Sequence, residues 1–262
     1  MPRSEIPVDV LRIIFDLVDK ADLVAICRVN KTCCFYAQNI LYRDIRCGRR
    51  TFKNVYRTLA RSAHLARRVR SFSSKDNLDS PVFATALRNM SSLRSLELGS
   101  IVPLLPNMFE GCTFKLDSFT CSNPDSEYLR KFLSSQPSLN SMTLYTELCA
   151  KPLDATCLPN LSRVTASISC LNYLIPGRPV CEVAAFGDIS HEDPIDLGFF
   201  TLATAPIQKL LIDYSYLHPK TGHYLASIFP SLTHFTMRIG QLVAFSKDKE
   251  VCWNSLIISM GF

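Results

Sequence analysis

The residue types that could carry acid–base or metal chemistry are few and scattered in this sequence. The five histidines are His64, His191, His218, His223 and His234. Only one lies beside acids, in the run His191-Glu192-Asp193, and its loop-like surroundings lead us to expect neither catalysis nor metal binding there. His218 and His223 could lie one helical turn apart, but Pro219 separates them and no acid is near. We therefore expect both at the surface.

The cysteines are numerous, but their spacing does not match a metal site or a disulfide framework. There are 11 of them, an odd number. Cys33 and Cys34 are adjacent, the others are dispersed, and no Cys-x-x-Cys cluster occurs. We expect free thiols, most of them buried as small apolar residues. Free thiols in turn predict a reducing compartment, cytoplasmic or nuclear.

Motifs that bind phosphates, dinucleotides or catalytic zinc are missing, as is the motif that presents a nucleophilic serine. We therefore expect a binding protein and not an enzyme, with no cofactor and no metal. The alternative is a hydrolase or transferase that is built on a parallel sheet and lacks a recognisable motif. That alternative would need titratable groups gathered at strand ends, which the sequence does not offer.

The composition fits a folded chain. It has 262 residues, of which 47% are hydrophobic and 20% charged, enough to build one large domain or two smaller ones. No run of about 18 apolar residues occurs, so no membrane-spanning helix is expected. The N-terminal segment carries Asp9, Arg12 and Asp16, whereas a secretory signal would need an uncharged apolar stretch there.

Positive charge is concentrated between Arg43 and Arg70, where ten basic residues accompany one acid, Asp44. Such a basic stripe could meet nucleic acid or an acidic partner, but it lacks interleaved aromatic residues for base stacking. The apolar residues within it are at helical spacing: Phe52, Val55, Tyr56 and Leu59. This spacing favours a helix with one buried face and a solvated basic face.

The pattern over residues 6–45 predicts three short helices. Pro7 suits a helix start, since its missing N–H costs nothing there, and Asp19 or Asp22 can cap the second helix. The expected apolar faces are Val10, Leu11, Ile14, Phe15 and Val18, then Leu23, Ile26 and Cys27, then Cys34, Ala37 and Leu41. Three short helices are marginal alone, so they need one another and a partner or the rest of the chain.

This stretch resembles an F-box. Its start, from Ile6-Pro7 to Leu11, matches the pattern Leu/Ile-Pro-x-Glu/Asp-hydrophobic-Leu that opens the motif. Asp22-Leu23, Val29-Asn30-Lys31 and the run from Leu41 to Ile45 are similar in order and spacing to its remainder. Residues 59–72 resemble the segment that leads into the repeats of fungal, basidiomycete-like F-box proteins. The chain departs from the pattern at Tyr42, where many members carry Trp, and in the short acidic connection from Asp16 to Asp22.

The resemblance implies a role in protein degradation. An F-box docks on a Skp-type adaptor, which links it to the cullin scaffold of an SCF ubiquitin ligase, while repeats bind the substrate protein. The implied adaptor-binding residues are Pro7, Leu11, Ile14, Phe15, Leu23, Val29 and Leu41. They could instead only pack the helices together, but three short helices cannot hide so many, so we expect an exposed apolar patch. A repeat-based interaction scaffold without a ligase role is the alternative function. No nucleic acid or membrane partner is expected.

A six-residue unit, hydrophobic-x-x-hydrophobic-x-hydrophobic, recurs through the rest of the chain. It starts at positions 69, 93, 116, 139, 161, 180, 207 and 232, separated by 24, 23, 23, 22, 19, 27 and 25 residues. Leucine-rich repeats have periods of about 20 to 29 residues. The pattern therefore predicts an irregular leucine-rich-repeat solenoid over residues 48–262, after the F-box-like motif of residues 1–47. The asparagine that usually follows the strand is missing.

Helix signals lie between several of these units. The pairs Ser80-Pro81, Asn123-Pro124, Asp193-Pro194 and His218-Pro219 suit helix starts. In the weakest stretch we expect no helix between Ala166 and Val180. Strands that alternate with helices at this period predict an α/β fold with a parallel sheet on the concave side and helices on the convex side.

The third and fifth positions of each unit should project from the concave sheet, because strand side chains alternate. Most of these residues are small and polar, which suits a protein partner, and the charged ones lie towards the C-terminal half. The expected substrate-binding residues are Arg163, Glu182, Lys209, His234 and Arg238. The alternative is a solvated face without a partner. The apolar tail, with Cys252-Trp253 and Leu256 to Ile258, is expected to cap the last repeat.

Overall fold

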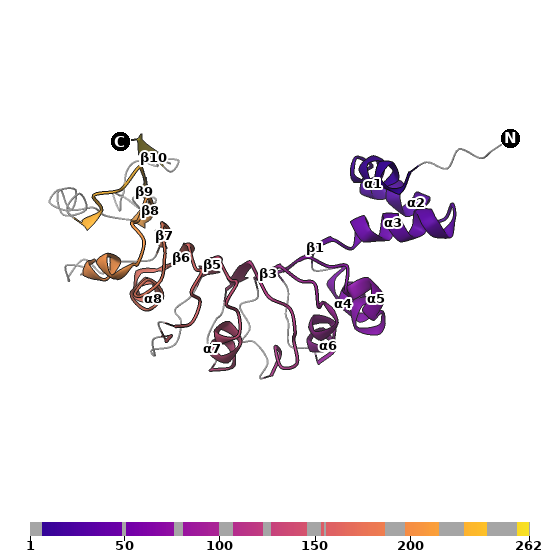
Figure 1. The fold of residues 1–262 in the computed structure, drawn as a ribbon, viewed down its shortest axis with the longest axis horizontal. Coiled ribbons are helices and arrows are strands. Elements are labelled where there is room, and N and C mark those ends of the chain that lie inside the picture. The colour runs from indigo at the N-terminus through magenta and orange to yellow at the C-terminus, as the bar shows by residue number, and fades with distance from the viewer. Residues whose placement is uncertain are drawn as a thin grey trace, which may run out of the picture. The chain divides into compact units, whose positions relative to one another are not determined.

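The computed structural model describes residues 7–48, 51–75, 81–99, 107–122, 127–145, 153–154, 156–186, 197–214, 228–239 and 256–261. The chain forms two units, Met1–Leu116 and Asp117–Phe262. Each is an α/β structure in which parallel strands follow one another in chain order, with helices beside them (Figure 1). No helix in these ranges is both long and apolar enough to cross a membrane.

The first unit begins with the three expected helices, α1 (Val8–Asp16), α2 (Lys20–Ile26) and α3 (Lys31–Leu41). Phe15, Leu23 and Ala37 form the small core between them. Asn30 ends the preceding turn and caps α3, because its side-chain oxygen accepts the Cys33 N–H at 2.8 Å. Asp19 precedes α2, but its side chain makes no capping hydrogen bond.

The other described elements of the first unit are three parallel strands and three helices. They are β1 (Asp44–Cys47), α4 (Phe52–Arg61), α5 (Ala63–Ala66), β2 (Ser71–Ser74), α6 (Pro81–Asn89) and β3 (Ser95–Leu98). Phe52, Tyr56 and Phe72 surround the Phe83 ring of α6, with centroid distances of 5.8, 6.3 and 5.6 Å. The buried apolar face predicted for α4 is therefore confirmed.

β1 pairs in parallel with β2, so the strand that ends at Cys47 belongs to this sheet. The expected boundary between the F-box-like motif and the repeats, between residues 47 and 48, falls at the end of this strand. That boundary stays a prediction.

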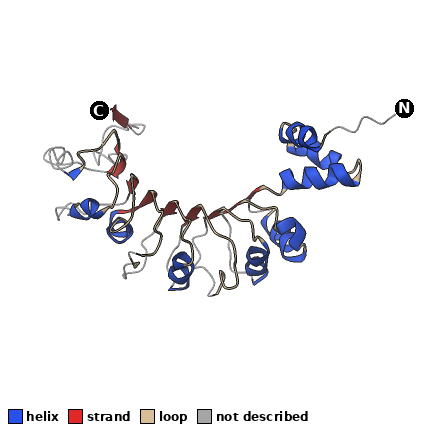
Figure 2. Ribbon diagram, in the orientation of Figure 1, coloured by secondary structure: helices blue, strands red, loops and turns tan. Residues whose placement is uncertain are grey.

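The described residues of the second unit form six parallel strands, the helices that connect some of them and an antiparallel edge strand. Its elements are β4 (Ser118–Cys121), α7 (Glu127–Ser134), β5 (Ser141–Leu144), β6 (Arg163–Ser167), α8 (Ile168–Leu174), β7 (Glu182–Phe186), the 3₁₀-helix η1 (Gly198–Leu202), β8 (Lys209–Tyr214), β9 (His234–Ile239) and β10 (Leu256–Gly261). Figure 2 shows α7 and α8 on the same side of the strands. β10 pairs antiparallel with β9, so part of the tail expected to act as a cap covers an edge that would otherwise be unpaired.

The predicted core positions are confirmed in the strands except in the last unit, where Leu232 and Phe235 are only half-buried. The apolar positions of the units that start at residues 93, 116, 139, 161, 180 and 207 are all buried. Equivalent positions are paired between neighbouring strands, as Ser141 with Arg163 and Arg163 with Glu182. The Asn140 carbonyl accepts the N–H groups of Ser162 and Arg163 at 2.9 and 3.0 Å, and the same forked bond recurs in the following units.

The helix predictions are confirmed in part. α6 and α7 follow Ser80-Pro81 and Asn123-Pro124 as expected, whereas the starts expected at Asp193-Pro194 and His218-Pro219 lie outside the described residues. The expectation of no helix between Ala166 and Val180 is wrong, because α8 occupies that stretch. The Ser167 side chain accepts the Cys170 N–H at 3.4 Å to begin it. A helix of seven residues is too short to give a clear period, and packing stabilises it.

Arg178 is almost completely buried beside the end of α8, with 1% of its surface exposed. Its guanidinium donates to the carbonyls of Tyr173, Leu174 and Pro176 at 3.1 to 3.2 Å. It also donates to the carbonyls of Leu153, Asp154 and Cys157, at 3.4, 2.7 and 2.9 Å. Burial lowers its pKa from the ordinary value. The side chain thus joins the C-terminus of α8 to the loop before β6.

Candidate functional site

The face of the strands of the second unit made by the third and fifth positions of the repeat units, here called the open face, lies opposite the core. Its described residues are half-buried or exposed, while the alternate residues of β4 to β8 are buried. Register places one polar row across six adjacent strands, formed by Ser118, Ser141, Arg163, Glu182, Lys209 and His234. Four of the five predicted substrate-binding residues therefore lie side by side.

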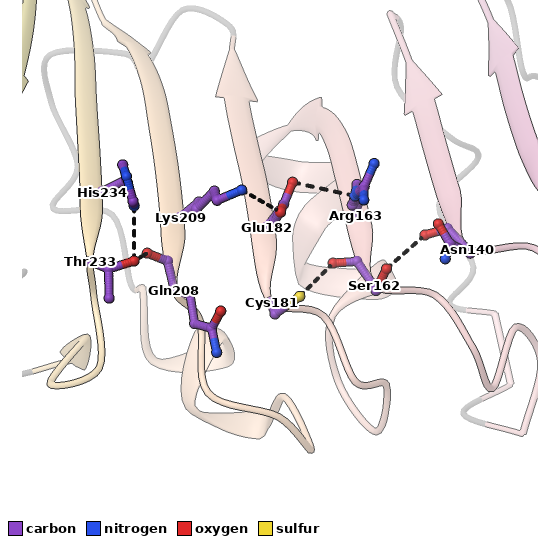
Figure 3. A network of polar contacts seen from close by, with 9 residues as sticks. All are labelled: Asn140, Ser162, Arg163, Cys181, Glu182, Gln208, Lys209, Thr233 and His234. Carbon is purple, nitrogen blue, oxygen red and sulfur yellow. Dashed lines mark hydrogen bonds and ion pairs between the residues drawn. The ribbon is translucent and has the colours of Figure 1, made fainter.

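Glu182 is held between two cations in this row. Its carboxylate accepts a hydrogen bond from Lys209 Nζ at 2.7 Å and lies 3.4 Å from Arg163 Nε (Figure 3). The hydrogen bond from Lys209 is the main cause of the lowered pKa of Glu182. The carboxylate is therefore charged at neutral pH, and the two ion pairs weaken only as the pH falls through that lowered pKa. The three side chains together present one net positive charge.

The second position of three units carries a side chain that binds the backbone carbonyl at the second position of the preceding unit. Ser162 Oγ donates to the Asn140 carbonyl at 3.3 Å, and Cys181 Sγ donates to the Ser162 carbonyl at 3.5 Å. Thr233 Oγ1 donates to the Gln208 carbonyl at 3.0 Å and also lies 3.0 Å from His234 Nδ1 (Figure 3). These contacts add to the forked backbone hydrogen bonds at the same carbonyls.

Arg238, the fifth predicted residue, lies in β9 opposite Asp213 of β8, and its side chain is outside the described part of the chain.

Sequence reasoning missed an aromatic pair on the same sheet. The rings of Tyr145 and Phe186 lie 5.9 Å apart, and Tyr145 is 56% exposed. Each follows the sixth and last position of its repeat unit. The sequence could have indicated that they lie on the open face only if the alternation of strand side chains were continued by one residue. Exposed aromatic residues are common anchors of protein interfaces.

The residues expected to bind an adaptor fall into two groups. Phe15 and Leu23 are buried in the core of α1–α3, and Leu11 and Leu41 pack against it. The other three, Pro7, Ile14 and Val29, are exposed. In the isolated chain the first group holds the helices together, and only the second offers surface to a partner.

A second apolar stripe runs along α1. Val10, Ile13, Ile14 and Leu17 are 43%, 63%, 43% and 83% exposed, and we call them the α1 stripe. Their spacing of three, four and seven residues places them on one side of the helix, next to the side that packs inward. Sequence reasoning did not name Ile13 or Leu17 because it assigned a single apolar face to this helix.

The chemistry-bearing residues do not gather into a metal site in the described ranges, where no group of three or more His, Cys, Asp and Glu side chains occurs. His191-Glu192-Asp193, His218 and His223 lie outside those ranges. Burial raises the pKa of Cys112 to about 12 and, together with Cys34, raises the pKa of Cys27. Neither thiol is therefore activated as a nucleophile at neutral pH.

Comparison with known proteins gives no family for this chain. No family model matches the sequence, and no curated protein matches it either.

Proposed function

We propose that this chain is an F-box protein with irregular leucine-rich repeats, and that it recognises substrates for a cullin-based SCF ubiquitin ligase in the cytoplasm or nucleus. Helices α1–α3 would dock on a Skp-type adaptor, and the open face would bind the substrate protein. The main observation that supports adaptor docking is the α1 stripe. It leaves four large apolar side chains in solvent on a helix whose other side already packs the core, and such surplus apolar surface marks a partner site.

The repeat assignment is supported by the order of the strands. Each sequence unit contributes one strand, neighbouring strands pair in parallel at equivalent positions, and the helices lie to one side. This arrangement is typical of solenoids whose repeats bury a continuous core. The open face supplies polar and charged side chains without an acid–base cluster in its described part, which suits protein recognition.

The adaptor proposal is tested by replacing the most exposed part of the α1 stripe. Ile13→Ser with Leu17→Ser should reduce co-purification of a Skp-type adaptor by at least about tenfold, since burying each of these side chains contributes roughly 1.5 to 3 kcal/mol. Because both side chains lie in solvent, the melting curve should hardly change. A charged substitution at Leu11 would be a poorer test, because Leu11 packs against the core of the three helices and the change would also destabilise them.

Tyr128→Ser with Leu202→Ser is the matched control, because both residues are exposed, at 48% and 57%, and lie outside the motif. This variant should retain the adaptor. Equal recovery of adaptor by the stripe variant and by the wild type would remove the ligase role and favour the scaffold alternative.

The open face is tested by reversing its charge. Arg163→Glu with Lys209→Glu, at side chains 60% and 51% exposed, should remove partners recovered by proximity labelling under proteasome inhibition. These exposed changes should alter stability by only about 0.5 to 1 kcal/mol. Lys53→Glu with Lys131→Glu, on exposed helix positions, is the control. An unchanged set of partners for the open-face variant would contradict substrate docking there.

A further inference from the structure

The basic stripe divides into two parts in the folded chain. Lys53, Arg57 and Arg61 lie exposed along α4, as the solvated face predicted from the sequence. Four arginines that flank α4 lie elsewhere, around a hollow of about 530 Å³ in the first unit: Arg43, Arg67, Arg68 and Arg70.

Five arginines line this hollow, here called the arginine hollow. Arg12 comes from α1, Arg43 follows α3, and Arg67, Arg68 and Arg70 come from the turn between α5 and β2. Asp16 is the one carboxylate in its wall, so five positive charges less one negative leave a net charge of +4.

Two of these arginines form a fixed wall. Arg43 lies 2.9 Å from Asp16 Oδ1 and 3.0 Å from Asp44 Oδ2, and the hydrogen bond to Asp44 is the main cause of its raised pKa. Arg68 donates to the Phe35 carbonyl at 2.7 Å, and its guanidinium carbon lies 4.7 Å from the centre of the Phe35 ring. These contacts leave little freedom to either side chain.

The side chains of the remaining three, Arg12, Arg67 and Arg70, are exposed and make no hydrogen bond or ion pair within the described part of the chain. The backbone holds Arg70 near the fixed wall, because the Arg43 carbonyl accepts the N–H groups of Arg70 and Ser71 at 2.8 and 3.0 Å. Like charges held close together repel one another, and an anion of matching geometry would relieve that repulsion.

We propose that the arginine hollow binds a phosphorylated side chain of a partner protein. Guanidinium groups bind phosphate oxygens through paired, charge-assisted hydrogen bonds, and a phosphoryl group at neutral pH brings nearly two negative charges. Tyr36 and Asn39 in the wall add a hydroxyl and an amide donor. Clusters of arginine are a recurring means of recognising phosphorylated segments.

A nucleic acid fits this site less well. Binding of a nucleic-acid backbone needs a positive groove that follows the strand and aromatic faces for the bases. Here the arginines surround one hollow, the exposed cations of α4 do not line it, and Arg68 already lies over the Phe35 ring. The site also uses none of the α1 stripe, so it does not depend on the adaptor proposal.

Fluorescence anisotropy can test the proposal on the full chain. The probe is a labelled Gly-Ser peptide with one central phosphoserine. It is compared with the unphosphorylated peptide of the same sequence, and inorganic phosphate serves as competitor.

We expect the phosphopeptide to bind at least about tenfold more tightly than the unphosphorylated peptide. The double variant Arg67→Gln with Arg70→Gln should remove that difference. Arg57→Gln with Arg61→Gln, exposed on α4, is the matched control and should bind as the wild type does. Adaptor co-purification should be unchanged in both variants, so that failure here is distinct from failure of the adaptor proposal.

Three results would overturn the inference. The first is equal binding of the two peptides, or no binding of the phosphopeptide below about 1 mM. The second is undiminished binding by the Arg67/Arg70 variant when its melting curve matches the control. The third is preferred binding of another ligand. Either inorganic phosphate binds the chain as tightly as the phosphopeptide does, or a short RNA binds it more tightly and the Arg67/Arg70 variant no longer binds that RNA.

Discussion

Replacing Arg178 with methionine should lower the free energy of unfolding by about 3 to 5 kcal/mol, as expected when a buried hydrogen-bond network around a charged group is broken. Six carbonyls accept hydrogen bonds from this one guanidinium. Methionine fills a similar volume but donates nothing, so it leaves buried acceptors unsatisfied, and each of them costs roughly 1 to 3 kcal/mol if no water reaches it. Urea unfolding followed by circular dichroism would measure the change.

Two further variants isolate the cause. Arg163→Met removes an arginine of strand β6 that is 60% exposed, and it should cost less than about 1 kcal/mol. Arg178→Lys keeps the charge but offers three donors where arginine has five, so it should also be destabilising. If Arg178→Met unfolds at the same urea concentration as Arg163→Met, the join between α8 and the loop before β6 is not important for stability.

Leu144→Ala should cost roughly 2 to 5 kcal/mol, whereas Ser141→Ala in the same strand should cost under about 0.5 kcal/mol. Leu144 is fully buried at the sixth position of its unit, while Ser141 is half-buried on the open face. The alanine at residue 144 leaves a cavity between packed repeats, and the alanine at residue 141 removes only a hydroxyl. Comparable losses at the two positions would contradict the assigned register.

The strands could be predicted because their signal is local. A unit such as Leu139–Leu144 fixes at once which residues enter the core, where the strand lies and how it aligns with its neighbour, since each repeat packs mainly on the next. The helix starts marked by proline, as at Pro81, are local signals as well. α8 lacks that mark, and its short apolar run directly follows β6, so the sequence did not distinguish it from a loop.

The two faces of α1 show where periodicity reaches its limit. The sequence identified an apolar helix, but Phe15 is buried and Ile14 beside it is 43% exposed. The difference is set by where α2 and α3 pack, because they cover one side of the helix and leave the α1 stripe in solvent. The spacing of apolar residues indicates that a side chain favours burial. It does not indicate whether another element of the chain covers that side chain.

By itself, the sequence determined the repeat period, the strand register, the core positions of most repeat strands and three N-terminal helices, because all of these depend on residues close together along the chain. The tertiary structure decided what depends on segments that meet from a distance. It placed Arg178, which reads as a surface residue in a Gly-Arg-Pro turn, among six carbonyls of two separate segments. It also divided the basic stripe, since Arg70 lines the same hollow as Arg12 of α1, whereas Arg57 lies exposed on α4 and does not line it. A charged side chain is buried or exposed according to the partners that the fold brings to it, and those partners are not written in its local pattern.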